Sequence, residues 1–162
     1  MRWIKHLTAG ASVRRLFPKA ALDAVHQAIA AGERRHRGQV CFAIEQAMPW
    51  RELARGRSVR ERAQDVFAQL RVWDTQHNSG VLIYVLLAER AIEIVADRGI
   101  AARVEQREWQ SICDRMRERF AAHEYERGAI DGVAAVSDML AHHFPHDGSV
   151  TGNELADSPV VL

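Results

Sequence analysis

The feature that most constrains this fold is a continuous apolar run at positions 81–87, VLIYVLL. A strand without polar alternation is typical of the centre of a sheet, where both faces are buried. A short link at 88–90 leads into a second apolar segment at 91–96, in which Ile92 and Ile94 alternate with other residues. A link of this length predicts an antiparallel hairpin. The hairpin is therefore expected to lie at the centre of the fold.

Three further elements are predicted before the hairpin. Apolar residues at helical spacing predict a helix over 18–36. Residues 39–45, QVCFAIE, are rich in β-forming side chains and predict a strand. Ser58 and Glu61 have the spacing of a capping box, which predicts a helix over 59–72.

Two more helices are predicted after the hairpin. The first is marked by apolar residues spaced i, i+3, i+4, i+7 and i+11, namely Trp109, Ile112, Cys113, Met116 and Phe120. The second ends at Pro145, which cannot continue a helix. The predicted order is helix, strand, helix, strand, strand, helix, helix. This order indicates an α/β sandwich with a small mixed β-sheet.

The composition argues against a membrane or disulfide-stabilised protein. No apolar run approaches the roughly 18 residues that a membrane span needs. The N-terminus has basic residues but no apolar stretch typical of a signal peptide behind them. Cys41 and Cys113 lie far apart and form no disulfide framework, so both are expected to be buried thiols. We therefore expect a cytoplasmic protein.

Charge is distributed unevenly along the chain. Residues 1–71 hold 14 Lys and Arg against 6 Asp and Glu, whereas residues 72–162 hold 8 against 15. One interpretation is that the two halves pack together and neutralise each other. The alternative is a basic surface that follows a phosphate backbone, formed by Arg51, Arg55, Arg57, Arg60 and Arg62.

The hairpin predicts the first candidate site. It places the start of the strand 81–87 beside the end of the strand 91–96, so His77, Asn78 and Asp74 should approach Asp97. Carboxylate, amide and backbone carbonyl oxygens together can hold Ca²⁺ or Mg²⁺. Such a metal could polarise a phosphoryl oxygen. The alternative is that these are turn residues whose side chains bond their own backbone.

A second candidate site lies at the opposite ends of the strands. Glu45 ends the first strand and Glu89 follows the second, so the two carboxylates are neighbours if these strands are parallel. Paired carboxylates can share a cation or shift each other's pKa. The alternative is two solvated turn residues with Arg90 as their counter-charge.

A histidine group near the end of the last helix offers a weaker metal site. Its members are His142, His143, His146 and the neighbouring Asp147. Histidines at a helix C-terminus are also favourable for the helix dipole alone. No nucleophile elbow, P-loop, dinucleotide fingerprint, HExxH or CxxC motif is present. Trp73 and Trp109 are expected in the core, while Trp3 and Trp50 are expected at the surface.

The segment 77–85, HNSGVLIYV, is followed by the segment 90–100, RAIEIVADRGI. In this combination the sequence resembles the TPM domain family, and these two segments are the most specific part of the match. Supporting matches are Ala63, Val66, Phe67, Trp109, Phe120, Tyr125, Gly128 and the closing His143, Phe144 and Pro145. The resemblance implies an αβα sandwich over residues 16–146, which leaves an N-terminal extension over 1–15. Residues 147–162 are rich in Gly, Ser and Asp without periodicity, so a flexible tail is expected there.

The resemblance also implies a function. Some plant members of the family are described as acid phosphatases and as calcium-binding. This implies a phosphatase dependent on Ca²⁺ or Mg²⁺. The group predicted at the hairpin then supplies Asp97, Asn78, Asp74 and His77 as its metal ligands, and Asp97 and Glu45 are expected as its catalytic residues. The alternative is a non-catalytic module that docks a protein partner, such as a membrane-anchored one. A metal-dependent nuclease or a nucleic-acid binder acting through the basic half is a weaker alternative.

Overall fold

A four-stranded mixed sheet in the order β3-β2-β1-β4 forms the centre of the molecule. The computed structural model describes residues 13–148 and 152–162. The strands are β1 (Gln39–Glu45), β2 (Gly80–Leu86), β3 (Ala91–Ala96) and β4 (Val160–Val161). β1 and β2 run parallel, with Gln39 opposite Gly80. β2 and β3 form the predicted antiparallel hairpin, linked by the 3₁₀ turn η1 (Leu87–Glu89).

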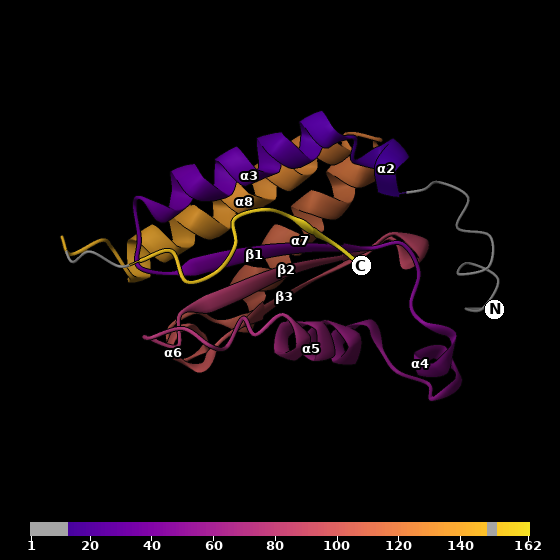
Figure 1. Cartoon of the computed structure of the whole chain (residues 1–162), viewed down its shortest axis with the longest axis horizontal. Helices are drawn as coiled ribbons and strands as arrows, with labels where there is room; N and C mark the ends of the chain where they lie inside the picture. Colours follow the sequence, from indigo (N-terminus) through magenta and orange to yellow (C-terminus); the bar gives the residue numbers. More distant parts are fainter. Residues whose placement is uncertain (1–12, 149–151) are drawn as a thin grey trace.

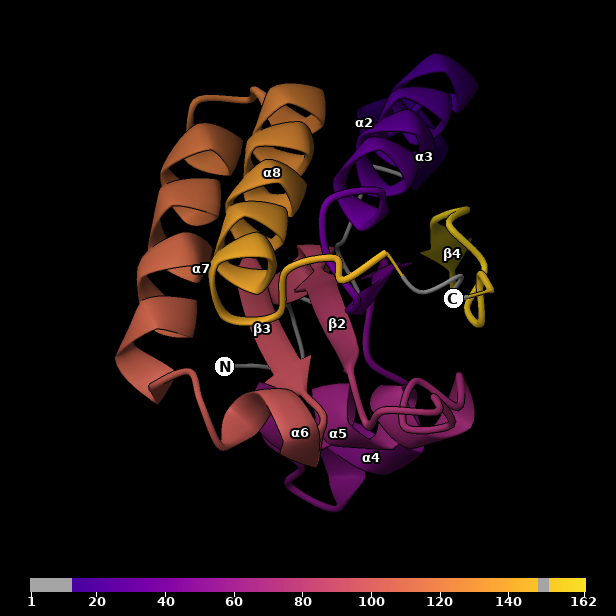
Figure 2. The ribbon, with the colours of Figure 1, turned by 90° about the vertical axis from the view of Figure 1, so that its left-hand side faces the viewer.

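Helices cover both faces of the sheet, so the predicted αβα sandwich is confirmed (Figure 1). One layer contains α3 (Lys19–Glu33), α7 (Gln106–Ala121) and α8 (Tyr125–His143), preceded by the short α2 (Val13–Leu16). The other contains α4 (Trp50–Ala54) and α5 (Val59–Gln69). Figure 2 shows α7 and α8 side by side over β3 and β2, with α5 and α4 beneath the sheet.

The hydrophobic core is divided by the sheet into two clusters, one for each helical layer. Every residue of β1 and β2 is buried, as the continuous apolar runs predict. The five apolar residues that predict α7 are all buried in it, because their spacing places them on one face of the helix. The capping box at Ser58 and Glu61 is present and begins α5.

Several element boundaries differ from those predicted. α3 ends at Glu33 rather than 36, and α5 ends at Gln69 rather than 72. Past α5 the chain turns sharply, with Arg71 in the left-handed region at φ 54°. α4 and α6 (Arg98–Ala101) lie where the sequence predicts only connections. Helices this short carry too little periodicity to be recognised.

The prediction of a flexible tail over 147–162 is wrong for residues 152–162. Residues 152–162 return to the sheet, where β4 pairs with β1 through Val160 opposite Ala43. The backbone N–H of Leu162 also donates to the carbonyl of Ile44 at 2.9 Å. A two-residue strand has no periodicity, so only its pairing partner reveals it. Residues 1–12 of the expected N-terminal extension lie outside the described residues, and Val13 begins α2.

The tryptophans follow the predictions with one exception. Trp109 is buried and Trp50 is exposed, as expected. Trp73 was expected in the core but is 48% exposed. The guanidinium of Arg71 lies 5.9 Å from the centre of its ring, so the ring packs against a cation at the surface. Trp3 lies outside the described residues.

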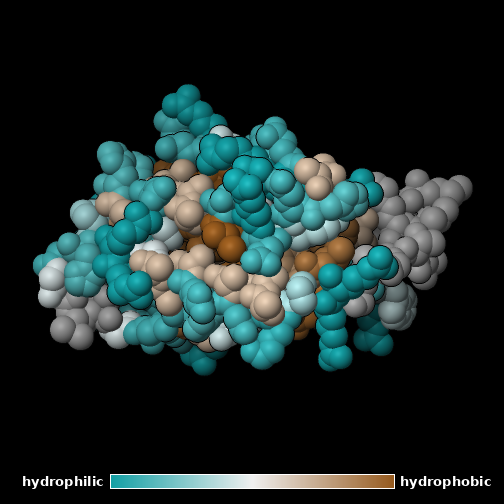
Figure 3. Space-filling view, turned by 90° about the horizontal axis from the view of Figure 1, so that it is seen from above, coloured by the Kyte–Doolittle hydropathy of each residue, from teal (hydrophilic) through white to brown (hydrophobic). Residues whose placement is uncertain are grey.

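The basic and acidic halves of the chain meet at several ion pairs. Cross-half pairs are Arg35–Asp138 at 2.8 Å, Arg37–Asp147 at 3.0 Å and Arg60–Glu93 at 3.3 Å. Within the basic half, Arg55 and Arg57 pair with Glu52. These pairs reduce the positive charge available to a phosphate backbone. Seen from above, the α3–α8 layer is mostly hydrophilic, with apolar side chains in small patches (Figure 3).

Within the described residues, no helix is both long enough and apolar enough to cross a membrane.

A buried histidine is expected to make the fold acid-sensitive. His36 is 1% exposed, and its Nδ1–H donates to the carbonyl of Gly38 at 3.1 Å. Burial lowers the pKa of His36 to about 4, below its ordinary 6.5. Stability from the neutral ring is therefore complete above pH 6.5 and is lost as the pH falls towards 4.

We expect the loss from this histidine to reach about 3 kcal/mol in the free energy of unfolding. His36→Asn retains a donor near the Nδ1 position but does not titrate. Urea unfolding of both proteins between pH 7 and 4 should give a flatter profile for the variant. Parallel profiles would contradict the assignment.

Candidate functional site

The candidate site lies at the end of the sheet where β2 begins and β3 ends. The hairpin register places Val81 opposite Ala96, so the next residue, Asp97, lies beside the loop 74–79. The backbone N–H of Asp97 donates to the carbonyl of Gly80 at 2.9 Å. The N–H of Gly99 donates to the carbonyl of Asn78 at 3.1 Å. The structure therefore brings Asp97 and the Asn78 backbone together, as the hairpin topology predicts.

The loop is held in a tight conformation by its own polar groups. The Thr75 hydroxyl accepts from the N–H of Ser79 at 2.9 Å, and the Thr75 carbonyl accepts from the N–H of Asn78 at 3.2 Å. Thr75 and Ser79 are both buried. Asn78 has φ 49°, a left-handed conformation that asparagine tolerates better than most residues. These hydrogen bonds therefore give the loop a defined conformation.

Gly99 allows the loop to approach the start of α6. A Cβ atom at this position would lie 2.7 Å from the carbonyl oxygen of Asn78 and 2.9 Å from that of His77. Only glycine leaves room for two backbone oxygens this close. The carbonyl oxygens of His77 and Asn78 therefore both lie close to Gly99, two residues after Asp97.

The Asp97 side chain is the distinctive group of the site. It is 6% exposed and forms the N-cap of α6, with Oδ1 accepting from the N–H of Arg98 at 2.7 Å. Its other oxygen, Oδ2, is buried and has no hydrogen-bond partner within the part of the chain that the structure describes. A buried carboxylate oxygen without a partner is costly, so this atom is suited to an external cation or donor.

The remaining predicted ligands do not gather their side chains around Asp97. Asp74 is exposed and pairs with Arg71, and His77 and Asn78 are exposed. Among the described residues, no group of three or more His, Cys, Asp or Glu is placed to hold a metal ion. The oxygens close to the site are therefore one carboxylate and backbone carbonyls, and the side chains of Asp74 and His77 make no such cluster.

Glu45 lies at the other end of the sheet from Asp97. It is the last residue of β1, whereas Asp97 adjoins Gly80, which is opposite the first residue of β1. The two ends of β1 are about 20 Å apart, since each strand residue adds about 3.3 Å. Glu45 and Asp97 therefore cannot act on the same bond, and the prediction of a shared catalytic site is wrong.

The interpretation of Glu45 as half of a solvated carboxylate pair is also wrong. β1 and β2 are parallel as that pairing requires, yet the partner of Glu45 is Arg62 of α5 rather than Glu89 or Arg90. Arg62 donates from Nε at 2.9 Å and from NH2 at 2.7 Å, forming a bidentate pair. The Tyr84 hydroxyl donates to Glu45 Oε2 at 2.5 Å.

This Glu45–Arg62–Tyr84 network is closed to solvent. The three residues are 4%, 7% and 0% exposed. The hydrogen bonds to Glu45 raise the pKa of Arg62 above its ordinary value, and burial raises the pKa of Tyr84. With both carboxylate oxygens occupied, the network is suited to holding α5 on the sheet. The sequence carried one signal for it, because Arg62 shares the buried face of α5 with Ala63 and Val66.

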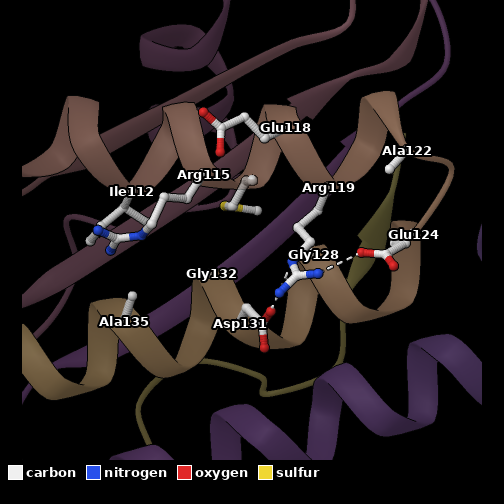
Figure 4. A pocket seen from close by; sticks show the side chains of 11 residues that line it. Ile112, Arg115, Glu118, Arg119, Ala122, Glu124, Gly128, Asp131, Gly132 and Ala135 are labelled. Carbon is white, nitrogen blue, oxygen red and sulfur yellow. Dashed lines mark hydrogen bonds and ion pairs between the residues drawn. The ribbon is translucent and has the colours of Figure 1, made fainter.

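The layer that contains α3, α7 and α8 has a groove of about 410 Å³ between α7 and α8. Figure 4 shows Arg119 reaching across it to Glu124 and Asp131, at 2.7 and 3.4 Å. Gly128 and Gly132 form one wall and allow the helices to pack closely, because added Cβ atoms would meet Phe120 and Met116. The groove contains none of the predicted metal or catalytic residues, and it is lined by two arginines and three carboxylates.

The predicted histidine site is not assembled. The rings of His142 and His143 lie 4.8 Å apart edge to face, and Nδ1 of His146 accepts from the N–H of Gly148 at 3.0 Å. Asp147 pairs with Arg37. Both cysteines are buried, and burial raises the pKa of each thiol to about 11, as suits inert core residues.

Comparisons with known proteins agree with this architecture. The sequence model of the TPM domain matches residues 14–139. The BA42 protein from the psychrophilic bacterium Bizionia argentinensis has a similar structure, with a TM-score of 0.81 and 24% identity over 93% of this chain and 99% of that one. The N-terminal domain of a protein from P. gingivalis has a TM-score of 0.63 and 18% identity over 88% and 85%. These likenesses establish the fold. No curated protein matches the chain in sequence.

Proposed function

Because this chain belongs to the TPM domain family, we propose that it binds a divalent cation through Asp97 and hydrolyses phosphoesters with it. The observation that carries the proposal is the buried Oδ2 of Asp97, which has no partner among the described residues. This atom lies at the end of the sheet where the loop 74–79 brings backbone carbonyls close to Gly99. The donor set is entirely oxygen, which favours Ca²⁺ or Mg²⁺ over softer metals.

Few protein ligands are available, so the cation would retain several waters. Asp97 would supply the negative charge, and its second oxygen would stay bonded to the N–H of Arg98, which fixes the carboxylate in place. The carbonyls of His77 and Asn78, which lie close to Gly99, would be the neutral ligands, although that of Asn78 already accepts from the N–H of Gly99. A bound divalent cation would supply charge stabilisation at a phosphoryl oxygen. A site of this kind favours small, exposed phosphoesters, because Asn78, His77 and Asp74 leave the loop open to solvent.

Asp97→Asn tests this proposal sharply. Asparagine caps a helix about as well as aspartate, so the N-cap of α6 should be retained. The variant loses the charge but keeps the shape of the side chain. We expect calorimetric titration with CaCl₂ and with MgCl₂ to detect binding to the wild type and none to the variant. Hydrolysis of p-nitrophenyl phosphate should be lost in parallel.

Asp74→Asn is the matched control, because Asp74 is an exposed carboxylate of the same loop that already pairs with Arg71. It should bind the cation nearly as tightly as the wild type. Unchanged binding by Asp97→Asn would exclude the site. A folded wild type that binds neither cation would overturn the proposal and favour the alternative, a non-catalytic module that docks a protein partner.

A further inference from the structure

The C-terminal segment 152–162, here called the strap, connects the candidate site to the edge of the sheet. The side-chain oxygen of Gln39 accepts from the backbone N–H groups of Glu154 and Leu155, at 3.0 and 3.1 Å. Glu154 Oε2 in turn accepts from the N–H of Gln76, in the site loop, at 2.6 Å. Farther along the strap, β4 pairs with β1. One segment therefore contacts both the loop and the strand edge.

We propose that the strap is a proton-sensitive clamp that positions the loop 74–79, with Glu154 as the positioning residue and with Glu33, which faces Asp157 of the strap, as the proton-sensitive group. The clamp depends on the proposed function in one respect, because the loop that it holds is the loop proposed to bind the cation. The contacts of the strap exist independently of that assignment.

Glu154 is placed to act through the loop rather than on a substrate. Its bond to Gln76 fixes a backbone N–H two residues before Asn78. Asn78 has a left-handed backbone conformation, and this conformation sets the direction of its carbonyl, which accepts from the N–H of Gly99. Gln76 and Glu154 are 78 residues apart in the sequence, so this bond exists only while the strap is docked. Release of the strap would leave Gln76 without this bond, while the bonds of Asn78 to Gly99 and of Ser79 to Gln39 would remain.

Glu33 and Asp157 make the docking dependent on pH. Oε1 of Glu33, at the end of α3, accepts from the N–H of Val40 at 2.7 Å. Asp157 of the strap lies beside it and also accepts from Nδ2 of Asn153 at 2.7 Å. From β1, the group that faces Glu33 is the Cys41 thiol, which stays neutral because its pKa is raised to about 11. Two carboxyl groups thus meet where the strap crosses α3 and β1.

The protonation of Glu33 defines how docking of the strap depends on pH. Burial raises the pKa of Glu33 from 4.5 to about 7; the Val40 bond opposes this, and the negative charge of Asp157 adds to it. A pKa raised in the docked state means that docking favours the proton. Docking is therefore strongest below pH 4.5 and weakens as the pH rises towards 7, where Glu33 loses its proton beside the negative charge of Asp157.

Amide hydrogen exchange of the full chain tests the clamp at the Gln76 and Leu162 amides. After correction for the intrinsic rate, we expect protection of both to fall by about tenfold or more between pH 5 and pH 8 in the wild type. Glu33→Gln keeps an acceptor for Val40 but cannot ionise, so its protection should not change with pH. Asp157→Asn removes only the facing charge and leaves Glu33 buried, so it should reduce the change with pH without abolishing it. A wild-type profile that is flat, or one that Glu33→Gln reproduces, would overturn the proposal.

Glu154→Ala separates positioning from docking, because it removes the acceptor of the Gln76 N–H. It should lower the protection of the Gln76 amide at both pH values and leave that of Leu162 unchanged, because β4 stays paired. In the wild type, Ca²⁺ affinity should decrease several-fold from pH 5 to pH 8, and in Glu33→Gln it should not. Absence of Ca²⁺ binding together with pH-dependent exchange would retain the clamp and reject the cation site. Ca²⁺ binding with pH-independent exchange would reject the clamp and retain the site.

Discussion

Replacing Glu45 by alanine is expected to lower the free energy of unfolding by about 3–5 kcal/mol. The guanidinium of Arg62 would remain buried without its counter-charge, and the hydroxyl of Tyr84 would lose its acceptor. An uncompensated buried charge is among the most destabilising changes that a single substitution can make. Urea unfolding followed by circular dichroism measures the loss directly. Arg62→Ala should have an effect of similar size, because it leaves the buried carboxylate unpaired.

Two further variants separate the charge from the packing. Tyr84→Phe removes one hydrogen bond to Glu45 and should cost about 1 kcal/mol. The double variant Glu45→Leu with Arg62→Met removes both charges and should recover most of the stability lost in Glu45→Ala. A Glu45→Ala protein as stable as the wild type would show that the pair does not hold α5 on the sheet.

Gly80→Ala is expected to be the most disruptive change near the candidate site. A Cβ atom at Gly80 would lie 1.9 Å from the backbone carbonyl oxygen of Val72 and 2.9 Å from its carbonyl carbon. These are backbone atoms, so relief requires the loop after α5 to move away from β2. We expect a loss of about 3 kcal/mol in the free energy of unfolding, at the upper end for overpacking.

The same substitution should alter the candidate site. The carbonyl of Gly80 accepts from the N–H of Asp97, and Gly80 begins β2 directly after the loop 74–79. Cation affinity should therefore fall together with stability. Gly152→Ala is the matched control, since an added Cβ there meets nothing within 4 Å. It should unfold like the wild type. Equal stability of Gly80→Ala and Gly152→Ala would contradict the close approach of the loop.

The neighbourhood of the candidate site could be predicted because it depends on local topology. A short link between residues 81–87 and 91–96 requires an antiparallel hairpin, and a hairpin brings the residue after its second strand beside the residues before its first. Asp97 therefore had to lie near Asn78. The burial of one Asp97 oxygen without a partner could not be predicted, because it depends on how α6 and the loop 74–79 pack.

The sequence alone determined the central strands, the main helices and the sandwich they form. Their apolar periodicity records which faces are buried, and burial is what stabilises them. The tertiary structure alone decided the partners of the polar groups. Glu45 meets Arg62 and Tyr84 across separations of 17 and 39 residues, and the strap meets the site loop across 78. Such pairings leave no local pattern, because a buried charge or an unpaired strand edge is satisfied by whichever group the packing brings to it.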